Sequence, residues 1–486
     1  MSKEVRELEP LAVWRNFADL NAVPRPSKKE ERVCAFMINF GKSLGLETFK
    51  DAVGNVIIRK AASKGMEDRK MVTLQSHLDM VHQKNTDTIF DFDTQGIAMY
   101  IEDDWVKAKG TTLGADNGLG VATIMALLES KDITHPALEA LFTIDEETGM
   151  TGAMGLKAGV LKGDILLNLD TEEDDEIGIG CAGGIDVTAT KKYSEKSLSS
   201  KVTAYKILVK GLQGGHSGVD IHRGFGNANK IMNRILYACS KAHGIRISEI
   251  NGGGLRNAIP RESYAIISIK KSNAAIFEKE VQKLEALIKE ELKVMEPSLS
   301  IALEIVKKPQ KGMGIKTQKK LLSALYALHN GVYSWSAAIP DLVETSNNVA
   351  RVSVKNGTIT IACLTRSSVE SSKNDLVDML TATFELVGMK VALSGTYPGW
   401  NPNPDSEILK VLKEKYESLF KQKPRVAACH AGLECGILGT NYPDMDMISF
   451  GPTIKGAHSP DERVCISSVQ KYWSFVLEIL KDIPKK

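Results

Sequence analysis

The sequence predicts an α/β protein in which a mostly parallel sheet, flanked by helices, forms a discontinuous domain interrupted by an inserted α+β domain. Three short apolar runs predict buried strands, at residues 71–76, 138–144 and 164–169, and each is followed at once by histidine or acidic residues. Helical patterns separate these strands, which is typical of a parallel sheet. Because the carboxyl ends of parallel strands share one edge, the side chains that follow them are expected to meet there.

The bulk composition narrows the class of protein. A chain of 486 residues is too long for one simple core, so we expect two domains. The net charge of +2 gives no reason to expect nucleic acid or a membrane surface as a partner. No apolar run reaches the roughly 18 residues of a membrane span, and the N-terminal residues lack the apolar core of a secretion signal. Seven dispersed cysteines without a C-x-x-C pair indicate reduced thiols and a cytoplasmic location.

Two helices are predicted in the N-terminal part of the chain. Ser27-Lys-Lys-Glu30 has the pattern of a capping box and predicts a helix that runs towards Leu44. Residues 118–131 provide apolar side chains for one helical face, which predicts a second helix before the strand at 138–144.

The character of the sequence changes near residue 185 and returns at residue 397. We therefore expect the first domain to comprise residues 1–184 and 397–486, with residues 185–396 inserted as a second domain. The elements expected after residue 397 are a helix that Asp405 or Ser406 caps and that ends near Phe420, and a buried strand at residues 445–450.

The inserted domain shows alternating strand patterns between amphipathic helices. Its predicted strands include residues 202–210, 263–271 and 299–307, and its predicted helices are residues 227–243, 275–295, 317–329 and 370–387. Asn356-Gly357 predicts a type I′ hairpin turn. We expect two α/β layers of similar content, which suggests a duplicated unit.

Five side chains along the first domain have the chemistry of metal ligands. They are His77, Asp116, Glu147, Asp170 and His458. Imidazole and carboxylate groups bind zinc and similar divalent ions, and two ions about 3.5–4 Å apart need a bridging carboxylate. Asp116 is the best bridge, because small, glycine-rich neighbours let the backbone approach a metal pair closely.

Two further carboxylates next to these ligands suggest catalytic roles. Asp79 follows His77 by two residues and is placed to hold the tautomer of that imidazole. Glu146 and Glu147 are adjacent, so in an extended or turn segment they point in different directions. One can then bind metal while Glu146 acts as general base towards an activated water.

Two stretches invite other interpretations. The string Gly178-Ile-Gly180-Cys-Ala-Gly183 matches a dinucleotide fingerprint, but the residues that follow predict a strand where that fingerprint requires a helix. The acidic run Glu172–Glu176 favours a solvated loop over a calcium site. We therefore predict neither nucleotide nor calcium binding.

Together these motifs resemble the metallopeptidase superfamily of co-catalytic zinc aminoacylases, carboxypeptidases and dipeptidases. Within it the chain is most similar to the aminoacyl-histidine dipeptidases, also called cytosolic non-specific dipeptidases or peptidase D. The resemblance covers nearly the whole chain. It rests on residues 76–81, 110–120, 145–149, 181–186, 214–218, 256–262, 430–436 and 451–462.

The resemblance implies a role for each matched residue. One ion is implied to be held by His77, Asp116 and Asp170, and the other by Asp116, Glu147 and His458. Glu146 becomes the general base and Asp79 the partner of the histidine ligand. The inserted domain becomes a lid that also serves dimerisation.

Residues of the lid are implied to contact the substrate. His216 would stabilise the oxyanion, while Asn257 and Arg366 would hold the substrate's C-terminal carboxylate. The alternatives are a turn residue for His216, a cap before Pro260 for Asn257 and a solvated strand-end charge for Arg366. His430, Gly432 and Glu434 are placed near the substrate.

The resemblance implies two-metal hydrolysis of dipeptides, including Xaa-His dipeptides such as carnosine, with metal-bound hydroxide as nucleophile. The alternatives are an N-acyl amino acid deacylase, a tripeptidase, or a non-catalytic protein that binds peptides or metal. Zinc is the expected metal, and cobalt or manganese would fit the same ligands. A homodimer is implied. His216 could act within its own chain or across the dimer interface, and both possibilities are left open.

Overall fold

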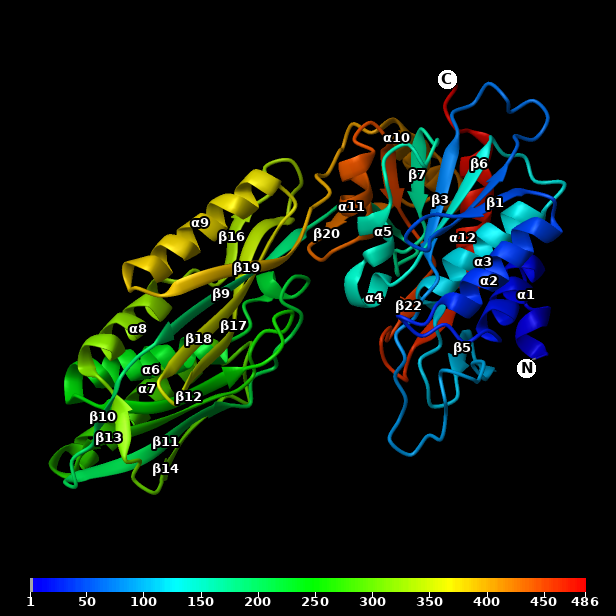
Figure 1. Cartoon of the computed structure of the whole chain (residues 1–486). Helices are drawn as coiled ribbons and strands as arrows, with labels where there is room; N and C mark the ends of the chain where they lie inside the picture. Colours follow the sequence, from blue (N-terminus) through cyan, green and yellow to red (C-terminus); the bar gives the residue numbers. More distant parts are fainter. Residues whose placement is uncertain (1–2) are drawn as a thin grey trace. The chain divides into compact units, whose positions relative to one another are not determined.

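The computed structural model describes residues 3–486, which form two compact units (Figure 1). The first unit runs up to Gly180 and takes in Trp400–Ala428 and Leu433–Lys486. The second unit comprises Cys181–Gly399 and the short segment Cys429–Gly432. The sequence placed the limits near 184 and 397 and did not anticipate that residues 429–432 return to the second unit.

A mostly parallel eight-stranded sheet forms the centre of the first unit, as predicted. Strands β6, β3, β7 and β21 run parallel to one another, whereas β2 pairs antiparallel with β6 and β8 antiparallel with β21. In spatial order the strands are β1 (Glu47–Lys50), β2 (Val56–Lys60), β6 (Leu138–Thr143), β3 (Val72–His77), β7 (Ile165–Asn168), β21 (Asp446–Ser449), β8 (Glu176–Cys181) and β20 (Arg425–Cys429).

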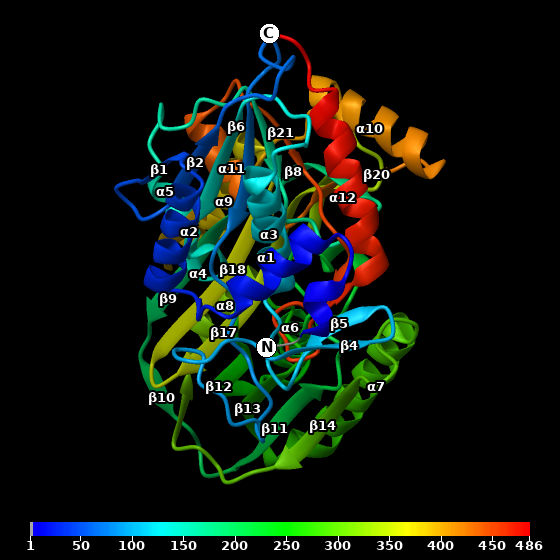
Figure 2. The same ribbon diagram turned by 90° about the vertical axis from the view of Figure 1, so that its right-hand side faces the viewer.

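Helices cover both faces of this sheet, which is why its central strands are buried along their whole length (Figures 1 and 2). The helices α2 (Glu31–Ser43) and α3 (Ala115–Glu129) pack on one face, and α1 (Leu11–Asn21) packs on α3. On the other face, α5 (Thr151–Gly155) and α11 (Glu434–Asn441) share an apolar cluster with β6 and β7. The C-terminal helices are α10 (Glu407–Phe420) and α12 (Ile466–Lys481).

A small four-stranded sheet lies within the same unit. Its strands are β22 (Ile454–Lys455), β23 (Arg463–Cys465), β5 (Trp105–Ala108) and β4 (Met99–Glu102). The loop between β22 and β23 carries His458. Short helical segments complete the unit at Glu4–Glu7 and at α4 (Glu146–Gly149).

One of the two predicted helix caps is wrong. The Ser406 side chain caps α10 by accepting a hydrogen bond from the Leu409 amide, as expected. The capping box at Ser27 does not form, because the Ser27 hydroxyl donates to the Met80 carbonyl and α2 begins only at Glu31. The Glu30 carboxylate instead accepts from the Lys28 amide at 2.7 Å.

The second unit contains one nine-stranded sheet whose neighbours are antiparallel. Its strands are β14 (Ser300–Ile305), β11 (Val202–Lys210), β13 (Ser263–Lys270), β12 (Arg246–Gly253), β17 (Val343–Lys355), β18 (Thr358–Ser367), β9 (Gly183–Lys192) and β19 (Lys390–Tyr397), with β16 (Gly331–Trp335) beside β17. A separate pair joins β10 (Glu195–Ser197) to β15 (Lys311–Met313). The helices α6 (Ala228–His243), α7 (Ala274–Leu292), α8 (Ile315–Ala327) and α9 (Glu370–Leu386) pack with the sheet in a single apolar core.

Two local predictions in this region are confirmed. Asn356 and Gly357 join β17 to β18, and their φ values of 49° and 72° are those of a type I′ turn. The glycine-rich string at 178–183 lies on β8 and β9 with no helix between them, which rejects a dinucleotide-binding turn.

The order of elements repeats within the second unit. The series β11-α6-β12-β13-α7-β14 has the same pattern as β9-α8-β17-β18-α9-β19 once β16 is left out, although β9 is separated from α8 in the chain by the whole first series. The two series meet where β12 pairs with β17. The expected two layers of similar content are therefore halves of one continuous sheet. Among the described residues, no helix is both long and apolar enough to span a membrane.

Gly120 lets α3 lie close to the ligand-bearing ends of β3 and β7. An added Cβ at this position would lie 2.8 Å from the Leu169 carbonyl oxygen. We expect Gly120→Ala to lower the free energy of unfolding by about 1–3 kcal/mol, since backbone cannot yield to the extra atom. Urea unfolding followed by circular dichroism measures this change.

Gly439 in α11 is the matched control. Its added Cβ would meet only the Met447 methyl carbon, at 3.8 Å. Gly439→Ala should therefore raise stability by about 0.5–1 kcal/mol through helix propensity. Equal effects of the two substitutions would contradict the close approach of α3 to the sheet.

Candidate active site

Five segments of the first unit converge on one group of candidate ligand side chains. His77 is the last residue of β3, Asp170 follows β7 by two residues, and Glu147 lies in α4 directly after β6. Asp116 is the second residue of α3, and His458 lies in the β22–β23 loop. The residues that follow β3, β6 and β7 thus lie together at one edge of the sheet, as the sequence predicted.

Asp116 stands between two sets of three ligand side chains. Its Oδ1 lies 3.1 Å from the His77 Nε2, and its Oδ2 lies 3.1 Å from the His458 Nε2. Asp170 Oδ1 is 3.5 Å from the His77 Nε2, and Glu147 Oε2 is 3.1 Å from the His458 Nε2. Within each set the ligand atoms lie within 4.8 Å of one another.

These sets fit a pair of divalent cations. Imidazole nitrogen and carboxylate oxygen are the donors that zinc, cobalt and manganese accept. The Oε1 atom of Glu147 is buried and has no hydrogen-bond partner among the described residues. A buried carboxylate oxygen without a partner is costly unless a cation or proton faces it.

The electrostatics of the group also suit a cation. Burial opposes protonation of His77, but Asp170, Asp116 and Asp79 outweigh it and raise the pKa of this imidazole well above its usual range. Hydrogen bonds to Asp116 and Glu147 raise the pKa of His458 to about 11. In both cases positive charge is stabilised where the carboxylates crowd together.

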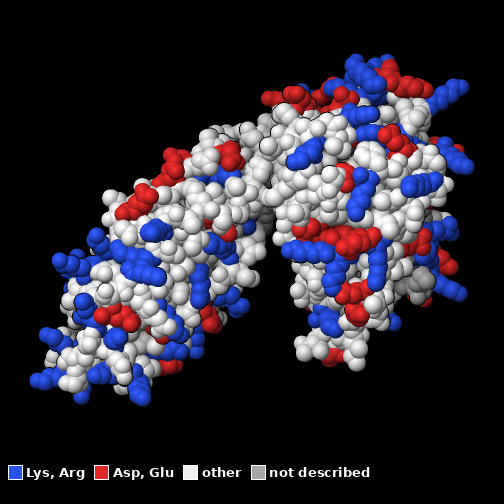
Figure 3. Space-filling view, viewed as in Figure 1, with Lys and Arg blue, Asp and Glu red and all other residues white. Residues whose placement is uncertain are grey.

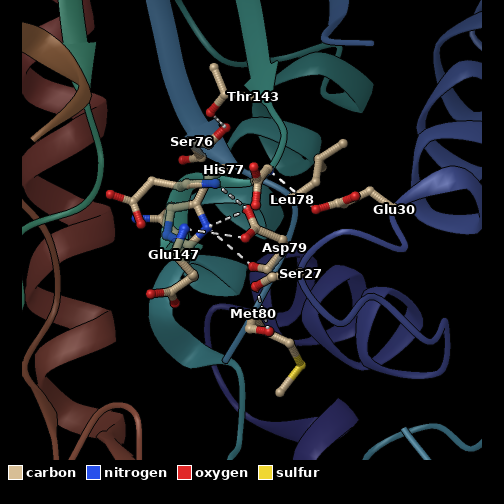
Figure 4. A network of polar contacts seen from close by, with 12 residues as sticks. Ser27, Glu30, Ser76, His77, Leu78, Asp79, Met80, Thr143 and Glu147 are labelled. Carbon is tan, nitrogen blue, oxygen red and sulfur yellow. Dashed lines mark hydrogen bonds and ion pairs between the residues drawn. The ribbon is translucent and has the colours of Figure 1, made fainter. Parts of the chain in front are cut away.

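Asp79 connects His77 to the Glu146–Glu147 turn (Figure 4). Its Oδ1 accepts a hydrogen bond from the Glu146 amide at 3.0 Å, and its Oδ2 accepts one from the Glu147 amide at 3.3 Å. The Nδ1 of His77 lies 3.1 Å from the Asp79 carbonyl oxygen and 3.4 Å from the Asp79 Oδ1. A proton on Nδ1 leaves Nε2 free as a ligand atom.

Glu146 lies close to this group but belongs to neither of the two sets. One oxygen from each of Glu146 and Glu147 lies within 4.8 Å of the other and of a His77 nitrogen. The turn is helical rather than extended, so the two adjacent side chains diverge less than the sequence suggested. Glu147 differs from Glu146 because its carboxylate also lies beside the Asp116 carboxylate and the His458 ring. Burial, with Asp170, Glu434 and Glu147 nearby and His77 opposing, raises the pKa of Glu146 well above its usual range.

A chain of buried polar side chains crosses the sheet one layer below the ligands. Glu434 is fully buried, and its Oε2 accepts from the Gln75 Nε2 and the Thr143 Oγ1, both at 2.6 Å. The Gln75 Oε1 accepts in turn from Asn168, whose Oδ1 accepts from Ser449. Of this chain only Glu434 was predicted from the sequence, and as a residue near the substrate. The signal for the others is a polar side chain two positions before a candidate ligand, as in Gln75 before His77 and Asn168 before Asp170.

The acidic run is only partly a solvated loop. Glu173 pairs with Lys455 and Asp174 with Lys471, as surface charges do. Glu172 differs, because burial and the nearby Asp116 and Asp170 raise its pKa to about 8. It is a further carboxylate beside the ligand group that the sequence analysis assigned to solvent.

In the second unit, His216 and Arg366 lie side by side. The His216 Nδ1 accepts hydrogen bonds from the Gly218 amide at 3.2 Å and the Val219 amide at 3.0 Å. The Arg366 Nη2 lies 3.4 Å from the His216 Nε2, and its Nη1 donates to the Tyr397 hydroxyl at 2.7 Å. Arg366 is 4% exposed, so it is not the solvated charge of the alternative interpretation.

The remaining predicted residues are more scattered. The Asn257 side chain is exposed, and its carbonyl accepts from the Ser217 amide at 2.7 Å, directly beside His216. His430 is buried in the second unit with its Nε2 2.8 Å from the Ser346 hydroxyl. Gly432 is half-buried in the loop before α11.

The surface charges are mixed. On the face shown in Figure 3, acidic and basic side chains are interspersed over each unit.

Comparison with known proteins places this geometry in a family. Residues 73–482 match the model of Peptidase family M20/M25/M40. The cytosol non-specific dipeptidase of Escherichia coli (strain K12) is 43% identical over 483 residues, which are 99% of this chain and 100% of that protein.

Solved structures agree with this assignment. The aminoacylhistidine dipeptidase of Vibrio alginolyticus has a TM-score of 0.93 and 43% identity, covering 100% of this chain and 99% of that one. An aminopeptidase from Bacillus cereus, 16% identical with a TM-score of 0.58, covers 98% of this chain and 99% of its own and shares the fold. The chain therefore belongs to peptidase family M20/M25/M40.

Proposed function

We propose that this protein is a dipeptidase that hydrolyses dipeptides with free termini, including Xaa-His dipeptides such as carnosine. The observation that carries the proposal is the Asp116 carboxylate, whose two oxygens each lie 3.1 Å from a different histidine. The similarity favours dipeptides over N-acyl amino acids or tripeptides, because two relatives that span the whole chain are named dipeptidases. By the same similarity we place the protein in the cytoplasm. The homodimer stays a prediction.

Two divalent ions, most simply zinc, fit the two ligand sets. His77, Asp116 and Asp170 would hold one ion, and Asp116, Glu147 and His458 the other. When bound, such ions polarise a carbonyl oxygen and lower the pKa of a water molecule. Cobalt and manganese take the same donors and are the alternatives.

Glu146 is proposed as the general base. Its carboxylate lies beside the ligand group, and burial raises its pKa above the usual range of a glutamate, which increases its affinity for the proton of the attacking water. It would take the proton of the attacking water and pass it to the leaving amine. Asp79 holds the Glu146 amide at 3.0 Å and so fixes the base relative to His77.

His216 is proposed to stabilise the oxyanion. Burial and the Arg366 charge lower the pKa of His216 to about 4, so the ring is neutral at physiological pH. Its Nδ1 accepts two backbone hydrogen bonds, which leaves the single ring proton on Nε2. The Arg366 Nη2, 3.4 Å from this Nε2, is then a close neighbour and does not donate a hydrogen bond to it. That N–H is the donor an oxyanion requires.

Arg366 is proposed to bind the C-terminal carboxylate of the substrate. The guanidinium is buried, and the hydrogen bonds that it donates within the described part of the chain go to the neutral hydroxyls of Tyr397 and Ser217. A buried arginine without an anionic partner is costly, and a planar carboxylate matches its fork of donors. We propose that Asn257, held beside His216 through its backbone, assists Arg366.

Glu434 and its neighbours receive more limited roles. Since Glu434 is fully buried, we propose that it supports β3, and through it His77, rather than touching a dipeptide. Gly432 stays a candidate for substrate contact because it is only half-buried and so is partly exposed to solvent. His430 is buried beside Ser346 and is proposed to support the Arg366 region.

Replacing Glu146 by Gln tests the base assignment. We expect kcat to fall by about 10²–10⁴-fold, because the proton acceptor is lost. Both ions should still bind, since Glu146 lies outside the two ligand sets. Glu147→Gln is the matched control and should lose metal. Steady-state kinetics with metal analysis measure both effects, and turnover of Glu146→Gln near the wild-type rate would refute the assignment.

Replacing Arg366 by Met tests carboxylate binding. A buried charge-assisted pair contributes about 1.5–3 kcal/mol, so kcat/KM for a free dipeptide should fall by roughly 10–200-fold. A dipeptide amide lacks the carboxylate, so the variant should cleave the amide about as well as the wild-type protein does. Arg366→Lys should recover part of the loss. An equal loss on the acid and the amide would count against the proposed contact.

A further inference from the structure

A single buried carboxylate holds the segment that carries Asp116. The Glu462 Oε2 accepts from the Leu113 amide at 2.7 Å and the Gly114 amide at 2.9 Å. Its Oε1 accepts from the Ala115 amide at 2.7 Å and the Asp116 amide at 3.2 Å. Four consecutive backbone donors thus converge on one side chain that is 2% exposed. Such a nest of amides is an anion site, and here the anion belongs to the chain itself.

The opposite side of the same segment is held by a buried cation. Arg25 donates from Nη2 to the Gly114 carbonyl, and the Asn21 side chain donates from Nδ2 to the Leu113 carbonyl at 3.0 Å. From Nη1, Arg25 donates to the carbonyls of Leu78 and Asp79, both at 3.1 Å. The segment 113–116 is therefore fixed through its amides on one side and its carbonyls on the other.

These contacts join the Asp116 segment to the loops of both histidine ligands. Glu462 stands four residues after His458 and directly before β23, so it belongs to the same β22–β23 hairpin. Leu78 and Asp79 directly follow His77. Glu462 therefore ties the Asp116 segment to the hairpin that carries His458. Arg25 ties the same segment to the residues that follow His77.

We infer that Glu462 and Arg25 are positioning residues that set the placement of Asp116 between His77 and His458. The inference rests on the proposed two-ion site and deepens it. Ligand distances in such sites are held to within about 0.2 Å, and loss of an outer partner typically costs 10–100-fold in metal affinity. A residue that fixes the bridging carboxylate should therefore affect ion binding more than it affects folding.

The test is Glu462→Gln in the full-length protein. Glutamine keeps one acceptor oxygen and places an NH₂ group against backbone donors, so at least two of the four amides lose their partner. We expect zinc affinity, measured by competition with a chromogenic chelator, to fall by about 10–100-fold. The visible spectrum of the cobalt-loaded protein should shift, and kcat should fall more than KM rises.

Glu296 provides a matched control in the second unit. It is also 2% exposed, and its carboxylate accepts from the Gln213 and Gly226 amides, both at 2.8 Å. Glu296→Gln should lower thermal stability and leave zinc affinity and the cobalt spectrum unchanged. An equal loss of zinc affinity in both variants would overturn the inference.

Glu462→Asp keeps the charge but is one methylene too short to reach all four amides. Its zinc affinity should lie between those of the wild-type protein and Glu462→Gln. If both Glu462 variants kept the wild-type zinc affinity and cobalt spectrum, the inference would be wrong. The proposed function would stand, because the ions would still bind. If neither variant folds while Glu296→Gln does, Glu462 serves folding and the inference is wrong. A wild-type chain that binds no ions overturns the proposed function as well.

Discussion

Asp116 presents one carboxylate oxygen to each of two histidines that come from distant parts of the chain, and this geometry constrains how the first unit folds. Its oxygens lie 3.1 Å from the His77 and His458 nitrogens. His77 stands at the end of a central strand, whereas His458 comes from a small hairpin near the C-terminus. The first unit must therefore close around a sequence separation of several hundred residues before the group exists. The interruption by the second unit is compatible with this, because the sheet and the hairpin belong to one compact body.

Crowded carboxylates are the cost of this arrangement. Burial and neighbouring negative charge raise the pKa of Glu146, Glu147 and Glu172, and the two histidines offset part of this by holding positive charge. Cations at the two ligand sets would offset it more completely, so ion binding and local stability are coupled. The same crowding gives Glu146 the proton affinity that a base requires. The same crowding of buried carboxylates thus favours both the binding of cations and the proposed role of Glu146 as a base.

Much of the fold was predictable, since buried strands and amphipathic helices have strong periodic signals. The type I′ turn at Asn356 and the Ser406 cap depend on local chemistry and were predicted correctly. The capping box at Ser27 failed because a distant carbonyl, that of Met80, took the hydroxyl. The ligand group was predictable from strand-end motifs. Glu462 and its four amides were not, because contacts between segments more than 340 residues apart leave no local pattern.

Whether the protein is a two-ion dipeptidase can be measured by a metal titration over a panel of substrates. Zinc is added back to metal-free protein while hydrolysis of a free dipeptide, its N-acetylated form and a tripeptide is followed. We expect dipeptide hydrolysis to rise until two ions are bound per chain, with the other substrates cleaved at least about 100-fold more slowly. Full dipeptide hydrolysis without added metal, or a preference for the N-acetylated substrate, would contradict this expectation.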